Sequence, residues 1–441
     1  MEFNIETYLN SLPEDTEEIN IENKQISYLP SLTRFNNLKK LNCSDNYLTY
    51  LPPLNDNLEK LCCHENQLTS LPRFNEKLSI LSCNNNQLTS LPELNKNLKE
   101  LYCYENQLTS LPTLNENLEL LNCENNELTS LPPLNDNLKG LYCDNNQLTC
   151  LPSLNKQLEQ LSCYNNKLTS LPSLNENLKK IWCDNNQLTS LPTFNENLDS
   201  LICKYNQLTY LPPLNEKLTQ LLCSNNQLTS LPSLNEKIKQ LYCANNKLTS
   251  LQHLNEELEE LFCVNNELTS LPPLNKRLKV LCCDNNELTS LPQINKRLKQ
   301  LSCNYNQLTS LPPMNKRLIE LSCSNNILNY LPQLYNNIEI LNIKNNPVSE
   351  IIVTNIYEND ENDENYEHYE HYEFYLYNIR KQIQILNKFR YLYYSLKFKQ
   401  RFRFYLWEKI REPKIRERYH PKYLIDNLKE DTDLDELLNQ W

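Results

Sequence analysis

The sequence predicts a solenoid of short stacked parallel strands, followed by a small helical module. Three observations lead to this fold class. A 20-residue pattern recurs fifteen times from residue 41 to residue 340 without an insertion. Each copy opens with Leu-x-Cys (once Ile-x-Cys), an alternation typical of a short strand with one buried face. Beyond residue 352 the pattern ends, and the composition becomes first acidic and then basic and aromatic.

The composition excludes several classes of enzyme. The 441 residues include one glycine, Gly140, with 18 cysteines and five histidines. Phosphate-binding loops, dinucleotide-binding turns and nucleophile elbows use glycine where the backbone approaches a ligand or takes a positive φ. No Cys-x-x-Cys pair occurs and the histidines are scattered, so zinc-finger and zincin spacings are absent. We therefore expect a protein that is not an enzyme and that uses no cofactor and no metal.

The N-terminal residues and the hydropathy pattern indicate the compartment. The first 18 residues, MEFNIETYLNSLPEDTEE, are acidic and lack the basic start and apolar core of a secretory signal. No apolar run approaches the roughly 20 residues of a membrane-spanning helix. We expect a soluble, cytoplasmic protein, in whose reducing surroundings the cysteines remain thiols.

Numbering the 20 positions of one row shows which residues recur. The row of residues 141–160 reads LYCDNNQLTCLPSLNKQLEQ. Across the fifteen rows, leucine or isoleucine occupies position 1, cysteine position 3, asparagine position 6 and leucine position 11, with leucine at position 8 as well. Proline, leucine and asparagine follow near positions 12 to 15, and leucine or isoleucine occupies position 18.

These patterns divide the chain into five parts. Residues 1–40 hold an N-terminal cap and a degenerate repeat, in which Ile21 occupies the cysteine position. Residues 41–340 hold the fifteen 20-residue repeats, and residues 341–357 hold a terminal partial repeat. An acidic linker over residues 358–373 then leads to a basic, aromatic and helical C-terminal module over residues 374–441.

The row pattern resembles that of a known family. Residues 138–148, LKGLYCDNNQL, match the leucine-rich repeat pattern LxxLxLxxNxL, with cysteine in the third apolar position. Over about residues 19–352 the rows are similar to the short repeats of bacterial effector proteins, which usually carry a second proline where this chain has asparagine at position 15. Some of those effectors end in a ubiquitin-ligase domain with a catalytic cysteine, whereas the last cysteine here is Cys323, inside the array. The resemblance implies a leucine-rich repeat solenoid, an α/β-type horseshoe with short parallel strands on the concave face and an irregular convex side.

Elementary packing arguments favour the same architecture. One 20-residue turn cannot bury its apolar face alone, so the turns must stack. Fifteen strands spaced by about 4.8 Å give an arc of roughly 70 Å, with the sheet on its concave side. Proline at position 12 disfavours long convex helices. The asparagine at position 6, such as Asn146, is expected to point inward and to satisfy buried backbone groups as a ladder of side chains.

The fifteen cysteines at position 3, from Cys43 to Cys323, have three interpretations: buried small apolar residues, a disulfide column or a metal-binding stack. We favour the first, because in-register strands hold Cβ atoms about 4.8 Å apart and a disulfide needs roughly 3.5 to 4.5 Å. Cys62, Cys150 and Cys282 lie outside the column and are predicted to be the more accessible thiols. His64, two residues after Cys62, leaves a reactive role open for that thiol.

Function is expected where the rows differ. Positions 2 and 4 point away from the core, so their side chains should line the concave face. At position 2, large apolar residues occur among the central rows only, since the outer rows carry residues such as Ser82 and Ser302. A regional aromatic stripe indicates a protein-binding patch, and the alternative is that these side chains only pack on each other and stabilise the sheet. The predicted partner-binding residues are Tyr102, Tyr104, Tyr142, Tyr164, Trp182, Ile202, Leu222, Tyr242 and Phe262.

A second gradient runs along positions 16 and 17, which are acidic in the early rows and basic in the late rows. The late rows form a basic ridge, which consists of Lys276, Arg277, Lys296, Arg297, Lys316 and Arg317. The ridge suits an acidic partner or phosphates, and the alternative is a solvated edge without a partner. Nucleic acid is disfavoured for the repeats, because the chain has a net charge of -12 and the array itself is acidic.

The C-terminal part reverses this charge. Residues 375–422 hold fourteen Lys or Arg against three Glu, and apolar residues recur at helical spacing from Ile379 to Leu396. We expect a helix that ends near Arg411, before Pro413. Two uses are open for this basic segment: binding of nucleic acid or an anionic membrane surface, or docking within the chain as a cap on the array.

The last residues, 407–441, resemble the C-terminal segment of many proteins of mimivirus-like giant DNA viruses, and the low glycine content fits such genomes. That resemblance implies a viral origin, with a location in the host cell cytoplasm or the virion, and implies no biochemical role. The complete sequence predicts a non-enzymatic scaffold that binds a protein partner, a host protein if the chain is viral, on its concave face. The alternative is an adaptor that recruits host machinery such as a ubiquitin ligase, or that binds nucleic acid, through its C-terminal module.

Overall fold

The computed structural model describes residues 3–349 and a set of helical residues between 379 and 401. They belong to two compact units, one of Met1–Asn329 with Tyr335–Asn346 and one of Tyr330–Leu334 with Pro347–Trp441. The first unit is the solenoid. The predicted acidic linker, residues 358–373, lies outside the described residues, as does the predicted end of the C-terminal helix near Arg411.

The solenoid contains one short helix, α1 (Ile5–Ser11), and short strands of three residues each. The strands are β1 (Glu18–Asn20), β2 (Lys40–Asn42), β3 (Lys60–Cys62), β4 (Ile80–Ser82), β5 (Glu100–Tyr102), β6 (Leu120–Asn122), β7 (Gly140–Tyr142), β8 (Gln160–Ser162), β9 (Lys180–Trp182), β10 (Ser200–Ile202), β11 (Gln220–Leu222), β12 (Gln240–Tyr242), β13 (Glu260–Phe262), β14 (Val280–Cys282), β15 (Gln300–Ser302), β16 (Glu320–Ser322) and β17 (Ile340–Asn342).

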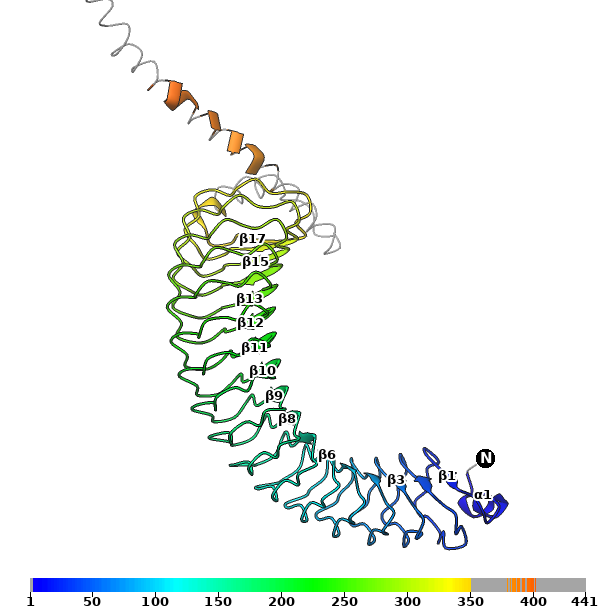
Figure 1. Ribbon diagram of the computed structural model, residues 1–441. Coiled ribbons are helices and arrows are strands. Elements are labelled where there is room, and N and C mark those ends of the chain that lie inside the picture. Colours follow the sequence, from blue (N-terminus) through cyan, green and yellow to red (C-terminus); the bar gives the residue numbers. More distant parts are fainter. Residues whose placement is uncertain are drawn as a thin grey trace, which may run out of the picture. The chain divides into compact units, whose positions relative to one another are not determined.

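These strands form one parallel sheet in which each strand pairs with the next along the chain. From β2 onward the register advances by one row at a time, as in the pairing of Leu201 with Leu221. Figure 1 shows the strands on the inner side of the curved array, with the irregular segments of each row outside. Within the described rows the convex segments contain turns and extended backbone and no helix, as the prolines at position 12 predict. The predicted solenoid is thereby confirmed.

The core consists of the recurring apolar positions. In the row of residues 201–220, Leu201, Cys203, Leu208 and Leu218 are all fully buried. The fifteen cysteines of position 3 are buried as well, and all 18 cysteines are free thiols. The column is therefore a strip of small apolar residues, as expected, because sulfhydryl groups pack well where strands approach closely.

The asparagine at position 6 joins each row to its neighbour. The Asn206 amide nitrogen donates to the carbonyl oxygens of Cys203, Lys204 and, in the preceding row, Cys183, at 3.2, 3.1 and 3.0 Å. Its Oδ1 accepts from the Leu188 amide of the preceding row at 3.0 Å. The same pattern recurs through Asn346. The predicted ladder is confirmed, and its members satisfy backbone groups that the strand pairing leaves unpaired.

Asparagine also takes the place of glycine in the turn after each strand. Position 5 of every row has a positive φ, between 51° and 58°, in the left-handed region. Asparagine occupies most of these positions, because its short polar side chain tolerates this conformation better than other non-glycine residues. Tyr205 and Tyr305 occupy it too, and their side chains are exposed. Positive φ angles therefore do not require glycine in these turns.

A second ladder, absent from the sequence prediction, runs along position 15. The Asn295 amide nitrogen donates to the carbonyl oxygens of Asn275 and Leu278 in the preceding row, at 2.8 and 3.0 Å. Its Oδ1 accepts from the amides of Arg297 and Leu298 in its own row, at 2.7 and 2.9 Å. The asparagine that replaces the second proline of the effector-type repeats thus holds the convex segments together.

The N-terminal end of the array is closed by α1. Asn4 caps this helix by accepting a hydrogen bond from the Thr7 amide at 2.9 Å, and Ile5 and Leu9 are buried. The Arg34 guanidinium donates to the carbonyl oxygen of Leu12 at 3.2 Å, just beyond the helix, and so connects the cap to the first row. In that row Ile21 takes the cysteine position and is fully buried.

We predict that Asn206→Ala lowers the free energy of unfolding by about 2 to 4 kcal/mol, because several buried backbone groups lose their partners. Denaturation by urea, followed by circular dichroism, measures the change. Gln207→Ala, at the exposed neighbouring position, is the matched control and should cost less than about 0.5 kcal/mol. Equal stability of the Asn206 variant and the control would contradict the role of the ladder.

Candidate protein-binding face

The concave face is formed by three columns of side chains, at positions 20, 2 and 4 of each row. In every strand from β2 on, the central residue is buried and the flanking residues, at positions 20 and 2, point to the other side of the sheet. The sequence prediction included positions 2 and 4 and missed position 20. The alternation of side chains along a strand is the signal that would have found it.

The structure brings five of the predicted residues into direct succession. The strand register pairs Trp182 with Ile202, Ile202 with Leu222, Leu222 with Tyr242 and Tyr242 with Phe262. The rings of Tyr242 and Phe262 are in contact, with centroids 4.4 Å apart. We call this stack of side chains, Trp182 to Phe262, the apolar stack.

The other predicted residues do not join the apolar stack. Tyr102 and Tyr142 also end their strands, but Asn122 and Ser162 lie next to them in the register. Tyr104 and Tyr164 follow the strands at position 4. All four tyrosines are half-buried, as are Trp182, Ile202, Tyr242 and Phe262.

Leu222 requires a correction. We expected it to line the surface, whereas its side chain is 7% exposed. It lies between Ile202 and Tyr242 in the register of the sheet, where side chains of adjacent strands pack against each other. Leu222 therefore supports the apolar stack from within and offers little surface to a partner.

Polar groups at position 20 border the apolar stack. Ser200 donates to Gln220 at 2.8 Å, Gln220 to Gln240 at 2.7 Å and Gln240 to Glu260 at 3.2 Å. Glu260 also accepts from the Tyr242 hydroxyl. This hydrogen bond, together with burial, which is the larger cause, raises the pKa of Tyr242 to about 12. The network fixes the tyrosine ring and leaves its edge available on the concave face.

Gly140 has a packing role at position 20. A Cβ atom at this residue would lie 3.2 Å from Cε2 of Tyr142 and 3.8 Å from the Leu120 side chain. The Tyr142 ring therefore lies close against the glycine backbone, and its hydroxyl donates to Gln160 at 2.8 Å. The glycine provides space for the tyrosine and not a special backbone angle.

Asp144 is a buried carboxylate beside these tyrosines, at 1% exposure. Its Oδ1 accepts from the Ser162 hydroxyl and the Tyr164 amide, both at 2.7 Å. Burial raises the pKa of Asp144 to about 7, and the nearby carboxyl of Glu124 adds to that rise, against the effect of the two hydrogen bonds. Asp144 thus holds the backbone of Tyr164 in place through the Tyr164 amide, and the pKa of this carboxyl is near neutral pH.

The raised pKa of Asp144 predicts a pH-dependent stability. Its pKa in the unfolded chain is about 4, so between about pH 4 and 7 the unfolded chain ionises at this residue while the folded chain keeps the proton, and the folded state loses stability as the pH rises. Asp144→Asn should therefore raise the free energy of unfolding by about 1 to 2 kcal/mol more at pH 8 than at pH 4.5, measured by urea denaturation. The control Asp56→Asn, at an exposed carboxylate, should show the same effect at both pH values. A gain for Asp144→Asn that does not depend on pH would contradict this account.

The three cysteines outside the column differ in exposure. Cys150 is exposed, and Cys62 and Cys282 are half-buried. Burial is the main cause that raises the pKa of Cys62, and it raises that of Cys282 to about 12. His64 contacts Ser82, at 3.3 Å from its hydroxyl. The raised pKa of Cys62 disfavours the reactive role that its position near His64 had left open.

A thiol reagent should therefore distinguish three groups of cysteines in the native protein. Cys150 should react first, Cys62 and Cys282 more slowly, and the column at position 3 only on unfolding, because burial excludes the reagent and raises the pKa of column thiols such as Cys43 to about 12. Mass spectrometry of timed samples measures the order. Rapid native labelling of the whole column would contradict its burial.

All six residues of the basic ridge are exposed. Arg277 forms an ion pair with Glu257 of the preceding row. The Lys316 ammonium lies over the ring of Tyr335, 5.9 Å from its centroid. The ridge precedes the strands in each row, so its residues belong to a surface separate from the three concave columns.

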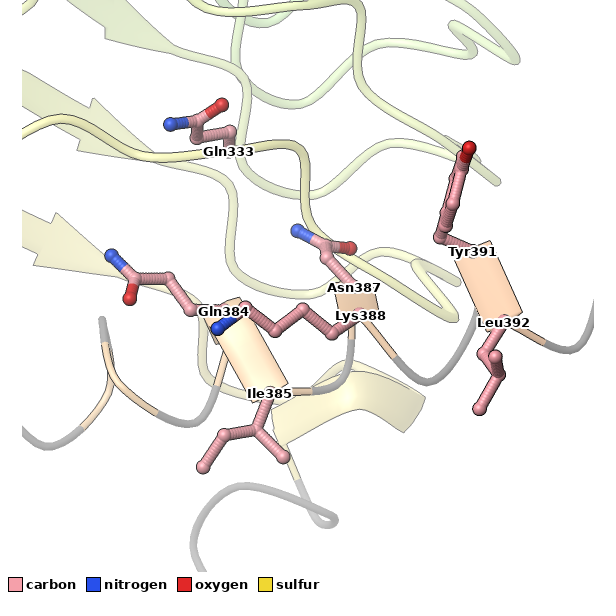
Figure 2. A pocket seen from close by; sticks show the side chains of 7 residues that line it. All are labelled: Gln333, Gln384, Ile385, Asn387, Lys388, Tyr391 and Leu392. Carbon is pink, nitrogen blue, oxygen red and sulfur yellow. The ribbon is translucent and has the colours of Figure 1, made fainter.

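The second unit contains a hollow of about 750 Å³, lined by Gln333, Gln384, Ile385, Asn387, Lys388, Tyr391 and Leu392. Figure 2 shows Asn387 directed toward the segment of Gln333, whereas Ile385 and Leu392 extend away from it. Among these lining residues Lys388 alone is charged, and no pair of acid and base groups suited to catalysis is present in this set.

The described residues lack two further kinds of feature. They contain no group of three or more His, Cys, Asp or Glu side chains placed to hold a metal ion. Within the same residues, none of the helices has the length and hydropathy needed to cross a membrane.

Comparison with solved structures places the fold in a family. The chain is similar to YopM from Yersinia enterocolitica, with 30% identity, a TM-score of 0.56 and coverage of 76% of this chain and 88% of that chain. It is similar to YopM from Yersinia pestis, a leucine-rich effector protein, with 33% identity, a TM-score of 0.60 and coverage of 74% and 88%. It also resembles a leucine-rich repeat protein of Leptospira interrogans, with 29% identity, a TM-score of 0.64 and coverage of 73% and 93%.

The chain belongs to the leucine-rich repeat proteins. This family membership agrees with the parallel solenoid of 20-residue rows described above. No protein-family model matches the sequence, and no curated protein matches it.

Proposed function

We propose that this protein is a non-enzymatic scaffold that binds a protein partner on its concave face, with the apolar stack as the centre of the interface. The observation that carries the proposal is the succession of Trp182, Ile202, Tyr242 and Phe262 on adjacent strands, all half-buried. Large aromatic side chains held in a rigid sheet are the usual anchors of protein interfaces. The extended concave surface of a solenoid is well suited to such contacts.

Packing among the anchors does not account for their presence. Outer rows carry serine at the same position, as in Ser302 and Ser322, and these rows keep the same strand pairing. The fold therefore tolerates small polar residues at position 2. Tyr102, Tyr104, Tyr142 and Tyr164 extend the proposed interface toward the N-terminal rows as a separate, more polar part.

The proposals on location and on the origin of the partner are based on the amino-acid sequence. The proposed setting is the host cytoplasm or the virion of a giant DNA virus, which the resemblance of residues 407–441 supports. Under this proposal the partner is a host protein. An adaptor role through the basic segment, residues 375–422, would add a second partner and leaves the role of the concave face unchanged.

The double variant Trp182→Ala with Tyr242→Ala tests the proposal. It should reduce capture of the partner from host-cell extract at least tenfold, because it removes two anchors of one contiguous surface. Loss of the contact with Phe262 should lower the free energy of unfolding by no more than about 1 to 2 kcal/mol.

The matched control is Tyr205→Ala with Tyr210→Ala, which removes two exposed tyrosines outside the concave columns of the same region. It should leave capture unchanged. Capture that survives in the Trp182 and Tyr242 variant, or that falls equally in both variants, would refute the concave interface.

A further inference from the structure

Three consecutive rows near the C-terminal end of the solenoid, residues 261–320, repeat one charged motif. Residues 275–279 and 295–299 both read Asn-Lys-Arg-Leu-Lys, and residues 315–318 read Asn-Lys-Arg-Leu. The lysines at position 19, Lys279 and Lys299, add two cations beside the six residues of the basic ridge. Three consecutive turns thus present eight cations at the edge where the strands begin.

The backbone beneath the ridge is held rigidly by the ladder of position 15. Asn315 donates to the carbonyl oxygens of Asn295 and Leu298 at 2.8 and 2.9 Å, as Asn295 does to the row before it. Successive turns are therefore stacked directly, about 5 Å apart. The cationic side chains therefore extend from columns of backbone positions that are fixed before any ligand arrives.

Elsewhere in the array several cations at the same edge are paired with carboxylates of the adjacent row. Lys139 pairs with Glu119 and Lys179 with Glu159, each at 2.7 Å across adjacent rows. Other lysines there bond to amide groups, as Lys217 does to Asn197 at 2.6 Å. Like charges do stack at position 16 of the rows before the ridge, but they are acidic, since glutamate fills this position in five consecutive rows from Glu176 to Glu256.

In the ridge such pairing is confined to one row. Glu257 and Glu259 pair with Arg277 and Lys279 at its first row only. The described residues place no carboxylate within ion-pair distance of Lys296, Arg297, Lys299 or Arg317, which leaves these four cations available to an external anion.

We propose that the basic ridge binds an acidic, extended segment of a partner protein. The three turns span about 10 Å, and side chains on one side of an extended peptide recur about every 6.6 to 7 Å. A segment of about four residues, with acidic side chains at alternate positions, therefore matches the length of the ridge. Arginine adds planar, bidentate contacts to carboxylates at each row.

Nucleic acid fits this surface less well. Binding of single strands relies on aromatic side chains on which bases stack, and the ridge residues include none. The preceding row also places Glu256 and Glu257 at the equivalent positions, where they would repel a phosphate chain that continued along the array. The ridge is a short binding site for carboxylates. It is independent of the concave interface.

Fluorescence anisotropy with the full-length chain and a labelled ten-residue peptide of alternating Glu and Ser tests this proposal. Binding should weaken as salt rises, and Lys296→Glu with Arg297→Glu should weaken it at least tenfold. The matched control, Lys156→Glu with Lys217→Glu, makes the same change of charge at equivalent exposed positions of other rows and should alter binding less than twofold.

A photo-crosslinker on the peptide locates the site, and circular dichroism verifies that both variants fold. Crosslinks should map to residues 275–319. The proposal is overturned by absence of binding to the native chain, by equal loss in both variants, or by crosslinks confined to residues 375–422. Tighter binding of a ten-residue oligothymidine than of the peptide, lost in the Lys296 and Arg297 variant, would also overturn it, because the ridge would then be a nucleic-acid site.

Discussion

The asparagine at position 6 of each row makes the hydrogen bonds on which the rest of the solenoid depends. A three-residue strand pairs few backbone groups, and the turn that follows it would bury several others without a partner. Asn206 satisfies three carbonyl groups and one amide, and two of these four groups belong to the preceding row. Each turn thus satisfies its buried backbone groups only when it stacks on the preceding row. The constant spacing of 20 residues follows from this requirement.

The same residue type solves two further problems of this backbone. At position 5 asparagine adopts the left-handed conformation that each turn requires, which explains how a chain with one glycine contains so many such turns. At position 15 asparagine links the convex segments, where the prolines leave few backbone donors. Leucine and cysteine fill the space between these ladders. The low glycine content, which excludes many enzymes, therefore does not limit the fold.

The repeated part of the structure was predictable because identical rows must repeat identical contacts. Leu141, Cys143 and Asn146 are all buried, as their spacing predicts. Leu141 lies in a strand, Cys143 in the core and Asn146 in the ladder of position 6. The deviations concern contacts between side chains of different rows. The burial of Leu222 depends on the size of its neighbours in the sheet, and the role of Gly140 depends on where the Tyr142 ring lies. The spacing of residues within one row does not show which side chains of other rows lie beside a given residue, nor where an aromatic ring packs.

The hydrogen-bonded ladders separate stability from recognition, since they use backbone groups of the strands and turns and not the side chains at positions 20, 2 and 4. A variant with serine at positions 102, 142, 182, 202, 242 and 262 tests this separation most directly, because serine already occupies the equivalent position of other rows. Its urea denaturation should show one cooperative transition with the native denaturant dependence, which reports the surface exposed on unfolding. Loss of the native circular dichroism spectrum, or a markedly smaller denaturant dependence, would show that the concave side chains hold the solenoid together and would contradict the account.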